Sequence, residues 1–273
     1  MRRIVILFII MIIMGCKNKP KQDENLRMVV ASPEIAEIIY KLDGIERIVG
    51  ISTQCDFPKK LNSLPKIGGF GSINIENIIN LAPTIVFTAG HEQQQLANEL
   101  EKLNIEAVII ESNNFSDLLE NIELIGKKID RIEEANKLVD SMKFEIAGLQ
   151  MPKNAPKVYI EIYSDPIMTV NDNSFVADII HIAGGKNLFS DLARPYCRIN
   201  QEDVINKNPD YLIKTCPIDD NIISSRKGWQ NISAIKNNRI INSEMVKSDW
   251  LVRAGPRSIK AIKEINRIFL EDE

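Results

Sequence analysis

The candidate side chains for ligating a soft metal in this sequence are three cysteines and one histidine, namely Cys55, His91, Cys197 and Cys216. Thiols, with or without the imidazole, suit a soft metal ion or the iron of a bound chelate. The simpler interpretation is one disulfide, Cys197–Cys216, and a spare thiol, because an odd number of cysteines leaves at least one unpaired. The spacing alone leaves both interpretations open.

Motifs that activate a nucleophile or bind nucleotides are absent from the sequence. There is no G-x-S-x-G, no P-loop, and no G-x-G-x-x-G between a strand and a helix. The carboxylates are numerous but scattered. The 34 Lys and Arg residues face 37 Asp and Glu residues, so no basic surface for nucleic acid is expected. We therefore predict neither an enzyme nor a nucleic-acid-binding protein.

The N-terminus has the pattern of a bacterial export signal. Two arginines precede the apolar run 4–14, which is shorter than the roughly 20 residues that span a bilayer. Ile13–Cys16 resembles a lipobox, in which the cysteine is acylated and becomes the first mature residue. We expect 1–15 to be a signal peptide, Cys16 the lipidation site and 16–26 a polar tether. The protein would then be extracytoplasmic and lipid-anchored to the cell membrane, on its periplasmic side or at the cell surface; an ordinary cleaved signal is the alternative.

Two segments of the sequence resemble each other and indicate an internal repeat. Residues 74–86 and 200–212 share the pattern N-x-E-x-(I/V)-I-N-x-x-P-x-x-(V/L). A second pair, 36–44 and 177–185, shares A-x-I-I and a following glycine, and occurs in the same order. The fold is therefore expected to contain two similar lobes.

Each half of the sequence predicts strands that alternate with helices, which is typical of parallel sheets. In the first half we expect strands at 28–31, 47–51, 84–88 and 106–110, and helices at 33–42, 74–82 and 92–103. In the second half we expect strands at 157–162, 211–215 and 239–242, and helices at 174–183, 202–207 and 256–270. The predicted fold class is α/β, with two parallel-rich sheets flanked by helices.

Residues 130–150 are expected to join the two lobes as one helix. Apolar residues recur there every three to four positions, and no glycine or proline occurs before Gly148. A helix of about 20 residues would be roughly 30 Å long. The predicted organisation is an N-terminal lobe (27–129), a rigid connecting helix (130–150) and a C-terminal lobe (151–273), with lobes that rock by a few degrees rather than close.

This organisation resembles that of the class III solute-binding proteins of ABC importers, the helical-backbone metal receptor type. Ser248–Arg257, Ala183–Asn187 and the two Asn-x-Glu helices resemble segments of the vitamin B12-binding and ferric-siderophore-binding branch. The resemblance covers about residues 27–271. It implies a monomer that captures a metal chelate and delivers it to an ABC permease dimer with its ATPase.

The resemblance favours cobalamin or a related corrinoid as the transported ligand, with a ferric siderophore or haem as alternatives. It implies no intrinsic cofactor, and contact with the membrane only through the lipid anchor. A surface sensor lipoprotein that uses the fold without transport is an alternative of a different class. A neighbouring permease gene would distinguish the two.

In such a fold the ligand lies between the lobes, at the carboxyl ends of the strands. The large apolar groups expected there are Phe70, Met168, Tyr196 and Trp250, and each could instead fill its own lobe. Phe70 and Tyr196 each precede a repeat helix by four residues, and fall where aromatic rings pack on the corrin in the B12-binding proteins. Arg253 could donate hydrogen bonds to acidic ligand oxygens.

Two further residue types complete the expectations from this resemblance. Arg257 is expected to tie the last helix to a neighbouring loop. The branch that binds bare zinc or manganese needs several histidines, whereas this chain has two, and His181 is expected in the core of a helix. No firm metal site is therefore predicted, and the three cysteines and His91 remain candidates only.

Glu76 and Glu202 occupy the same place in the two repeats, at the second position of helices capped by Asn74 and Asn200. A carboxylate there interacts favourably with the helix dipole, by about 0.3–1 kcal/mol. This local effect explains a carboxylate at one of the two sites, but it explains less well why both repeats carry a carboxylate at the same position. In the family that the chain resembles, glutamates on each lobe meet arginines of a two-fold permease, so both are expected to be docking residues.

Overall fold

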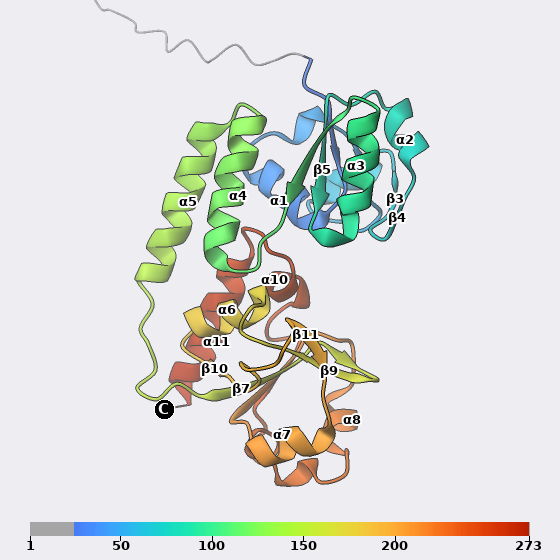
Figure 1. Cartoon of the computed structure of the whole chain (residues 1–273). Helices are drawn as coiled ribbons and strands as arrows, with labels where there is room; N and C mark the ends of the chain where they lie inside the picture. The colour runs from blue at the N-terminus through green and yellow to red at the C-terminus, as the bar shows by residue number, and fades with distance from the viewer. Residues whose placement is uncertain (1–24, 273) are drawn as a thin grey trace, which may run out of the picture.

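Two α/β lobes lie one above the other, beside a pair of helices that runs along one flank (Figure 1). The computed structural model describes residues 25–272. The expected signal peptide and Cys16 lie outside the described residues. Within residues 25–272, no helix is both long and apolar enough to cross a membrane.

The N-terminal lobe is built on a four-stranded parallel sheet. Its strands, in the spatial order β2-β1-β5-β6, are β2 (Ile48–Ile51), β1 (Met28–Val30), β5 (Ile85–Ala89) and β6 (Glu106–Ile110). The helices of this lobe are α1 (Pro33–Lys41), α2 (Ile75–Asn80) and α3 (Gln94–Lys102). Helix α1 begins at Pro33, whose fixed φ suits the first turn. The predicted elements of this lobe are confirmed to within a few residues at each end.

The C-terminal lobe repeats the same sheet. Its parallel strands, in the order β10-β7-β12-β13, are β10 (Lys186–Asn187), β7 (Lys157–Glu161), β12 (Tyr211–Lys214) and β13 (Ile240–Ile241). Its helices are α6 (Phe175–Ile182), α7 (Gln201–Lys207), α8 (Asp220–Ser224), α9 (Ser233–Lys236), α10 (Ser248–Val252) and α11 (Ser258–Glu271). The matching strand order confirms the two similar lobes that the repeat predicts.

Short antiparallel pieces of sheet, which the sequence patterns did not predict, lie outside the two parallel sheets. In the N-terminal lobe, β3 (Gly68–Gly69) and β4 (Ser72–Ile73) form a hairpin. In the C-terminal lobe, β8 (Tyr163–Ser164), β9 (Ile167–Val170) and β11 (Tyr196–Arg198) form a three-stranded sheet in the order β11-β9-β8. These pieces supply much of the candidate ligand site.

Two helices, not one, connect the lobes. Helix α4 (Phe115–Lys128) and helix α5 (Ile132–Ala147) pack against each other as a hairpin. A Cβ atom at Gly126 would lie 2.4 Å from the Cβ of Ala135, so glycine permits the close approach of the two helices. The predicted connecting helix, 130–150, is shorter at both ends, because Asp130 has a φ of 57° and the chain leaves the helix at Gly148.

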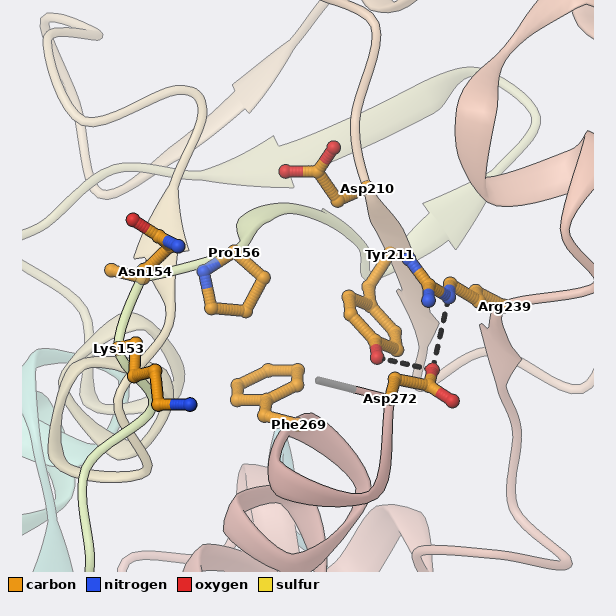
Figure 2. A pocket seen from close by; sticks show the side chains of 9 residues that line it. Lys153, Asn154, Pro156, Asp210, Tyr211, Arg239, Phe269 and Asp272 are labelled. Carbon is orange, nitrogen blue, oxygen red and sulfur yellow. Dashed lines mark hydrogen bonds and ion pairs between the residues drawn. The ribbon is translucent and has the colours of Figure 1, made fainter.

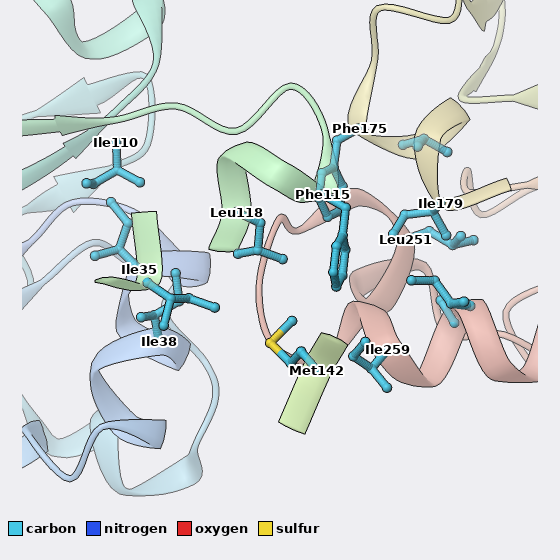
Figure 3. Close-up of a cluster of buried hydrophobic side chains, with 14 of the residues drawn as sticks. Ile35, Ile38, Ile110, Phe115, Leu118, Met142, Phe175, Ile179, Leu251 and Ile259 are labelled. Carbon is cyan, nitrogen blue, oxygen red and sulfur yellow. The ribbon is translucent and has the colours of Figure 1, made fainter. Parts of the chain in front are cut away.

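One apolar core extends from the N-terminal lobe into the C-terminal lobe, and we call the part between them the interlobe junction. Side chains of α1, α4, α5, α6, α10 and α11 meet there (Figure 3). The buried residues at this junction include Ile35, Ile38, Phe115, Leu118, Met142, Phe175, Ile179, Leu251 and Ile259. Burying side chains from both lobes in one cluster fixes the lobes against each other.

Candidate ligand-binding cleft

The carboxyl ends of the N-terminal-lobe strands are directed toward the C-terminal lobe. Asp56, which follows β2, forms an ion pair of 2.7 Å with Arg253 of the C-terminal lobe. The backbone N–H of Phe115, which follows β6, donates to Asp178 of α6 at 2.7 Å. The loops that follow these N-terminal strands therefore contact the C-terminal lobe directly.

One face of the three-stranded sheet β8-β9-β11 forms the C-lobe wall of this cleft. Met168 of β9 is paired directly with Tyr163 on one side and with Arg198 on the other. Directly paired residues project to the same face of a sheet, and Tyr196, two residues before Arg198, shares that face. The C-lobe wall therefore consists of Tyr163, Met168, Tyr196 and Arg198.

The opposite face of this small sheet is directed into the C-terminal lobe. The Oγ1 of Thr169 donates to the carbonyl of Ile160 in β7 at 2.6 Å. Cys197, which is paired with Thr169, donates its thiol to the carbonyl of Arg194 at 3.3 Å. The alternation along β11 thus separates Cys197 from Tyr196, although the sequence places both in one cleft loop.

Tyr196 shows that the C-lobe wall faces the other lobe. The pKa of Tyr196 is raised above its ordinary value of 10, first by loss of solvent and then by the negative charge of Glu92. Glu92 belongs to the 3-10 turn that follows β5 in the N-terminal lobe. The ring is nevertheless 55% exposed, so it remains open to a ligand.

Phe70 lies on the facing N-lobe wall, at the tip of the β3-β4 hairpin. Its N–H donates to the Oε1 of Gln54 at 2.9 Å, and its carbonyl accepts from the Nε2 of Gln93 at 3.1 Å. Gln93 is buried and also binds the backbone of Ala31 and Ala89, so it ties the hairpin to the central strands. Sequence reasoning missed Gln93. The ring of Phe70 lines a hollow of about 270 Å³ together with Glu92 and Leu96.

Trp250 and Arg253 both contact groups of the interlobe junction. Trp250 packs partly against the core, with Lys247 and Lys260 over its ring at 5.9 and 5.4 Å. Arg253 is 14% exposed, and its Nη1 lies 2.7 Å from Asp56 and 3.4 Å from both Glu37 and Asp249. These carboxylates already occupy the guanidinium, which would have to leave them to bind a ligand.

Glu37 is the buried charge at the interlobe junction. It lies on α1, is 2% exposed, and pairs with two arginines of the C-terminal lobe. Arg257 binds it through two nitrogens, one of them Nε at 2.7 Å, and Arg253 lies 3.4 Å away. Arg257 therefore ties the last helix to the other lobe and not only to a neighbouring loop. The signal for Glu37 was a carboxylate among the apolar residues of a predicted helix.

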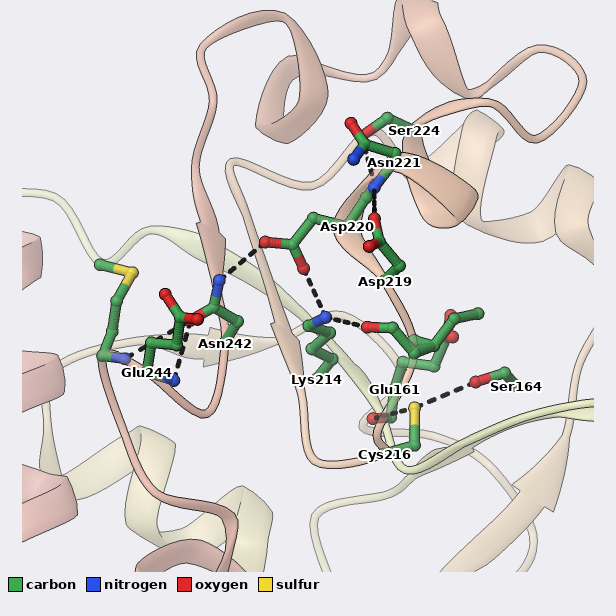
Figure 4. A network of polar contacts seen from close by, with 12 residues as sticks. Glu161, Ser164, Lys214, Cys216, Asp219, Asp220, Asn221, Ser224, Asn242 and Glu244 are labelled. Atoms are coloured by element: carbon green, nitrogen blue, oxygen red, sulfur yellow. Dashed lines mark hydrogen bonds and ion pairs between the residues drawn. The ribbon is translucent and has the colours of Figure 1, made fainter.

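All three described cysteines are free thiols, so the Cys197–Cys216 disulfide is not formed. Burial raises the pKa of Cys55 to about 11, so this thiol stays protonated at neutral pH. The Sγ of Cys216 lies 3.1 Å from the Oγ of Ser164, in a loop held by Lys214, Asp220 and Asn242 (Figure 4). Among the described residues, no three His, Cys, Asp or Glu side chains are grouped to hold a metal.

The two histidines differ in how far the structure describes them. His91 opens the short 3-10 helix His91–Gln93, directly after β5. His181, expected in the core, is exposed, and its Nε2 lies 3.1 Å from the Oδ1 of Asp172. The expectation for His181 was wrong because it lies in the last turn of a short helix whose other side carries the buried residues.

Glu76 and Glu202 lie at the second position of α2 and α7, as predicted, and both are exposed. Asn74 caps α2, since its Oδ1 accepts from the N–H of Glu76 at 2.8 Å. Asn200 stands at the N-cap of α7 without a side-chain bond. The two helices belong to opposite lobes (Figure 1).

A second hollow, of about 300 Å³, lies at the amino ends of the C-terminal strands and away from the cleft (Figure 2). Asp272 accepts a hydrogen bond from the hydroxyl of Tyr211 and lies 2.9 Å from the Nε of Arg239. Its charged groups are thus largely paired with one another, which suits a structural role at the end of α11.

Residues 28–244 match the sequence model of a family described as periplasmic binding protein. The chain belongs to this periplasmic binding protein family. Its two lobes with parallel sheets are the fold of the class III solute-binding proteins.

Relatives in this family support the assignment. The uncharacterized ABC transporter substrate-binding lipoprotein YvrC of Bacillus subtilis is 27% identical, over 94% of this chain and 82% of the relative. The vitamin B12-binding protein of Vibrio parahaemolyticus is 26% identical, over 89% of each chain. A possible iron-binding periplasmic solute-binding protein from Staphylococcus epidermidis superposes with a TM-score of 0.77 at 27% identity, covering 88% of this chain and 97% of that one. All three of these relatives are described as substrate- or solute-binding proteins.

Proposed function

We propose that the protein is the substrate-binding lipoprotein of an ABC importer and that it captures a metal chelate between its lobes. The proposal is supported by two aromatic residues, Phe70 on one lobe and Tyr196 on the other, which both lie near Glu92 in a chain of the periplasmic binding protein family. Aromatic faces on both sides suit a large flat ligand through dispersion and burial of apolar area. The vitamin B12-binding relatives support a ligand of this shape.

Among the metal chelates, we favour a corrinoid such as cobalamin, because Phe70 and Tyr196 offer aromatic faces from both lobes. Cobalamin carries its own axial ligands, so the protein needs to supply mainly apolar faces that pack on the corrin ring. Haem and ferric siderophores remain the alternatives that the test must include.

Titration of the purified protein with cobalamin, haemin and ferric siderophores, followed by absorption spectra and tryptophan fluorescence, tests this function. We expect saturable binding of cobalamin at micromolar or lower concentration and weaker binding of haemin. A protein that binds none of these chelates would contradict the proposal, and one that prefers haemin with a changed Soret band would reassign the ligand.

The exposed acids Glu76 and Glu202 are proposed to dock on a two-fold permease through its arginines. Replacing both with Gln keeps the helix starts intact and removes only the charges. Ligand affinity should be unchanged, while uptake in cells and complex formation with the permease should be lost. The matched control replaces one exposed acid of each lobe elsewhere, Glu101 and Glu244, with Gln. Equal transport by the two double variants would remove the docking role.

Membrane attachment is proposed to depend on acylation of Cys16. The extracytoplasmic placement is supported by the family, and the lipid anchor by the lipoprotein relative. Cys16→Ser should move the protein from the membrane fraction to the soluble fraction and abolish labelling with palmitate. A variant that still labels and sediments with membranes would contradict the anchor.

A further inference from the structure

An unpaired arginine stands on the C-lobe wall beside two exposed tyrosines. Arg198 is paired across the strands with Met168, which is paired with Tyr163. Tyr163 and Tyr196 are 54% and 55% exposed. Strands β9 and β11 lie on the side of the C-terminal lobe that is turned toward the N-terminal lobe (Figure 1). The charge of Glu92 of that lobe acts on Tyr196, so this exposed face and its arginine are directed into the cleft.

The arginines of the described residues are otherwise engaged. Arg226, Arg239, Arg253, Arg257 and Arg267 each pair with at least one carboxylate, and Arg27, Arg47 and Arg131 each donate to a backbone carbonyl. Within residues 25–272, only Arg194 and Arg198 make no side-chain hydrogen bond or ion pair. Of these two, Arg198 lies within the strand whose alternation sets it on the wall.

We propose that Arg198 binds an anionic oxygen group, a phosphate or a carboxylate, at the edge of the captured chelate. A guanidinium stays charged at all physiological pH values and donates two parallel hydrogen bonds to such a group. The neighbouring tyrosines and Met168 offer the apolar surface on which a flat ring system can lie. A neutral ligand would leave this arginine without a partner inside a partly dehydrated cleft.

The opposite wall determines the orientation of such a ligand. Glu92 carries a negative charge on the N-terminal lobe, close to Tyr196. An anionic group directed toward that wall would be repelled, whereas the same group directed toward Arg198 would be attracted. The chelate would therefore bind with its acidic edge against the C-lobe wall.

This inference rests on the proposed function and narrows the ligand to chelates that carry an acidic group. In a corrinoid the group is the phosphodiester of the nucleotide loop, which cobalamin has and cobinamide lacks. In haem the acidic group is a propionate, which is esterified and therefore uncharged in haem dimethyl ester. Both members of each pair keep the metal and its ring. Haem dimethyl ester differs from haem only at the acidic groups, whereas cobinamide also lacks the ribose and the base of the nucleotide.

The test measures the affinity of wild type and Arg198→Gln for both members of each pair. Arg198→Gln should weaken the acid-bearing member about ten- to a hundredfold, in line with the loss of a charge-assisted hydrogen bond, and should change the other less than about twofold. Lys236→Gln removes a positive charge from an exposed helix of the same lobe and controls for long-range attraction. It should leave all affinities unchanged.

Four results would overturn the inference, and the fourth would also contradict the proposed function. Equal losses of affinity for both members of a pair would show that Arg198 acts through the fold of the C-lobe wall. Equal losses of affinity in Lys236→Gln would show a general attraction of the anionic ligand by the positive charges of the lobe. No loss in Arg198→Gln, with tight binding by the wild type, would place the acidic group elsewhere and leave the proposed function standing. A wild type that binds none of the compounds would instead contradict the proposed function as well.

Discussion

The interlobe junction and the C-lobe wall use the same side-chain chemistry in opposite ways. At the junction, Arg253 and Arg257 surround Glu37, which is almost completely buried and bound through both carboxylate oxygens. On the wall, Arg198 has no partner among the described residues, and Tyr196 is more than half exposed. Paired and buried groups fix the geometry of the lobes, whereas unpaired and exposed groups are left for a ligand to complete.

Removing the charge of Glu37 is expected to have the largest effect on the stability of the interlobe junction. Glu37→Gln leaves Arg257 with Asp249, 3.8 Å away, as its remaining carboxylate, whereas Arg253 keeps Asp56 and Asp249. Removing one partner of a buried pair costs about 3–5 kcal/mol of unfolding free energy. Denaturant unfolding should show a large fall of the midpoint with little change of slope. The control is Glu46→Gln, which breaks an exposed pair with Lys60 and should cost about 0–1 kcal/mol. Similar losses in the two variants would mean that the junction is not locked by Glu37.

Truncating the cleft aromatics should give the reverse pattern, with affinity lost and stability kept. Phe70→Ala and Tyr196→Ala each remove apolar contact worth about 1–3 kcal/mol, so chelate binding should weaken roughly ten- to a hundredfold. Isothermal titration gives the affinity, and thermal unfolding shows whether the fold is intact. Phe144→Ala, at an 81% exposed ring on α5, should change neither. Unchanged affinity in both cleft variants would move the ligand away from these walls.

A smaller effect is expected from Glu34, which lies one helical turn before Glu37 on α1. Burial is the main cause that raises the pKa of Glu34 above its ordinary value of 4.5. The folded state therefore binds a proton more readily than the unfolded state, and the stability from this group is full below pH 4.5 and lost as the pH rises through the raised pKa. The wild type should lose stability relative to Glu34→Gln between acid and neutral pH.

Asp56 supplies the matching comparison of opposite sign. The hydrogen bond from Arg253 lowers the pKa of Asp56, so its contribution is present at neutral pH and is lost as the pH falls through the lowered pKa. Asp56→Asn should therefore cost more at neutral pH than in acid. Unfolding curves at a series of pH values compare the two variants with the wild type. The difference in unfolding free energy between wild type and variant should fall with rising pH for Glu34→Gln and rise for Asp56→Asn. A change in the same direction for both variants would contradict the raised pKa of Glu34 or the lowered pKa of Asp56.

The sequence predicted the repeated parts of the molecule well and the unique parts poorly. Matching residues at 74–86 and 200–212 led to two lobes with the same strand order, and placed Glu76 and Glu202 correctly in their helices. The sheet β8-β9-β11 was missed because its strands have two to four residues and β11 lies about 30 positions from its partner. Strands this short carry too little alternation to be recognised.

Two contacts of the site were beyond local sequence patterns for a different reason. Glu37 and Arg257 are 220 positions apart, and no periodicity relates them. Gln93 binds the carbonyl of Phe70 through a buried amide that resembles any other polar residue of the chain. Helix α4 was not among the predicted elements either, although it carried ordinary signals: Asn114 caps it, and Phe115, Leu118, Ile122 and Ile125 form its buried side.

We expect the connection between the two lobes to be stiff. The lobes share two packed helices and a common apolar core, so opening them would expose side chains such as Phe115, Phe175 and Leu251. Each exposed side chain of this size costs about 1.5–3 kcal/mol. Four of them would cost about 6–12 kcal/mol, which approaches the whole binding free energy of a nanomolar ligand, about 12 kcal/mol.

A hinged closure that separates the junction would therefore consume much of the binding free energy of the ligand, and we expect the lobes to keep their relative position. Small-angle scattering should show no resolvable change in radius of gyration when the wild type is saturated with its chelate. Glu37→Gln weakens the same junction, so any movement should be larger in that variant than in Glu46→Gln. A fall in the radius of gyration of the wild type as large as that of hinged sugar-binding proteins would contradict this expectation. It would mean that pairing and burial at the junction do not fix the distance between the lobes.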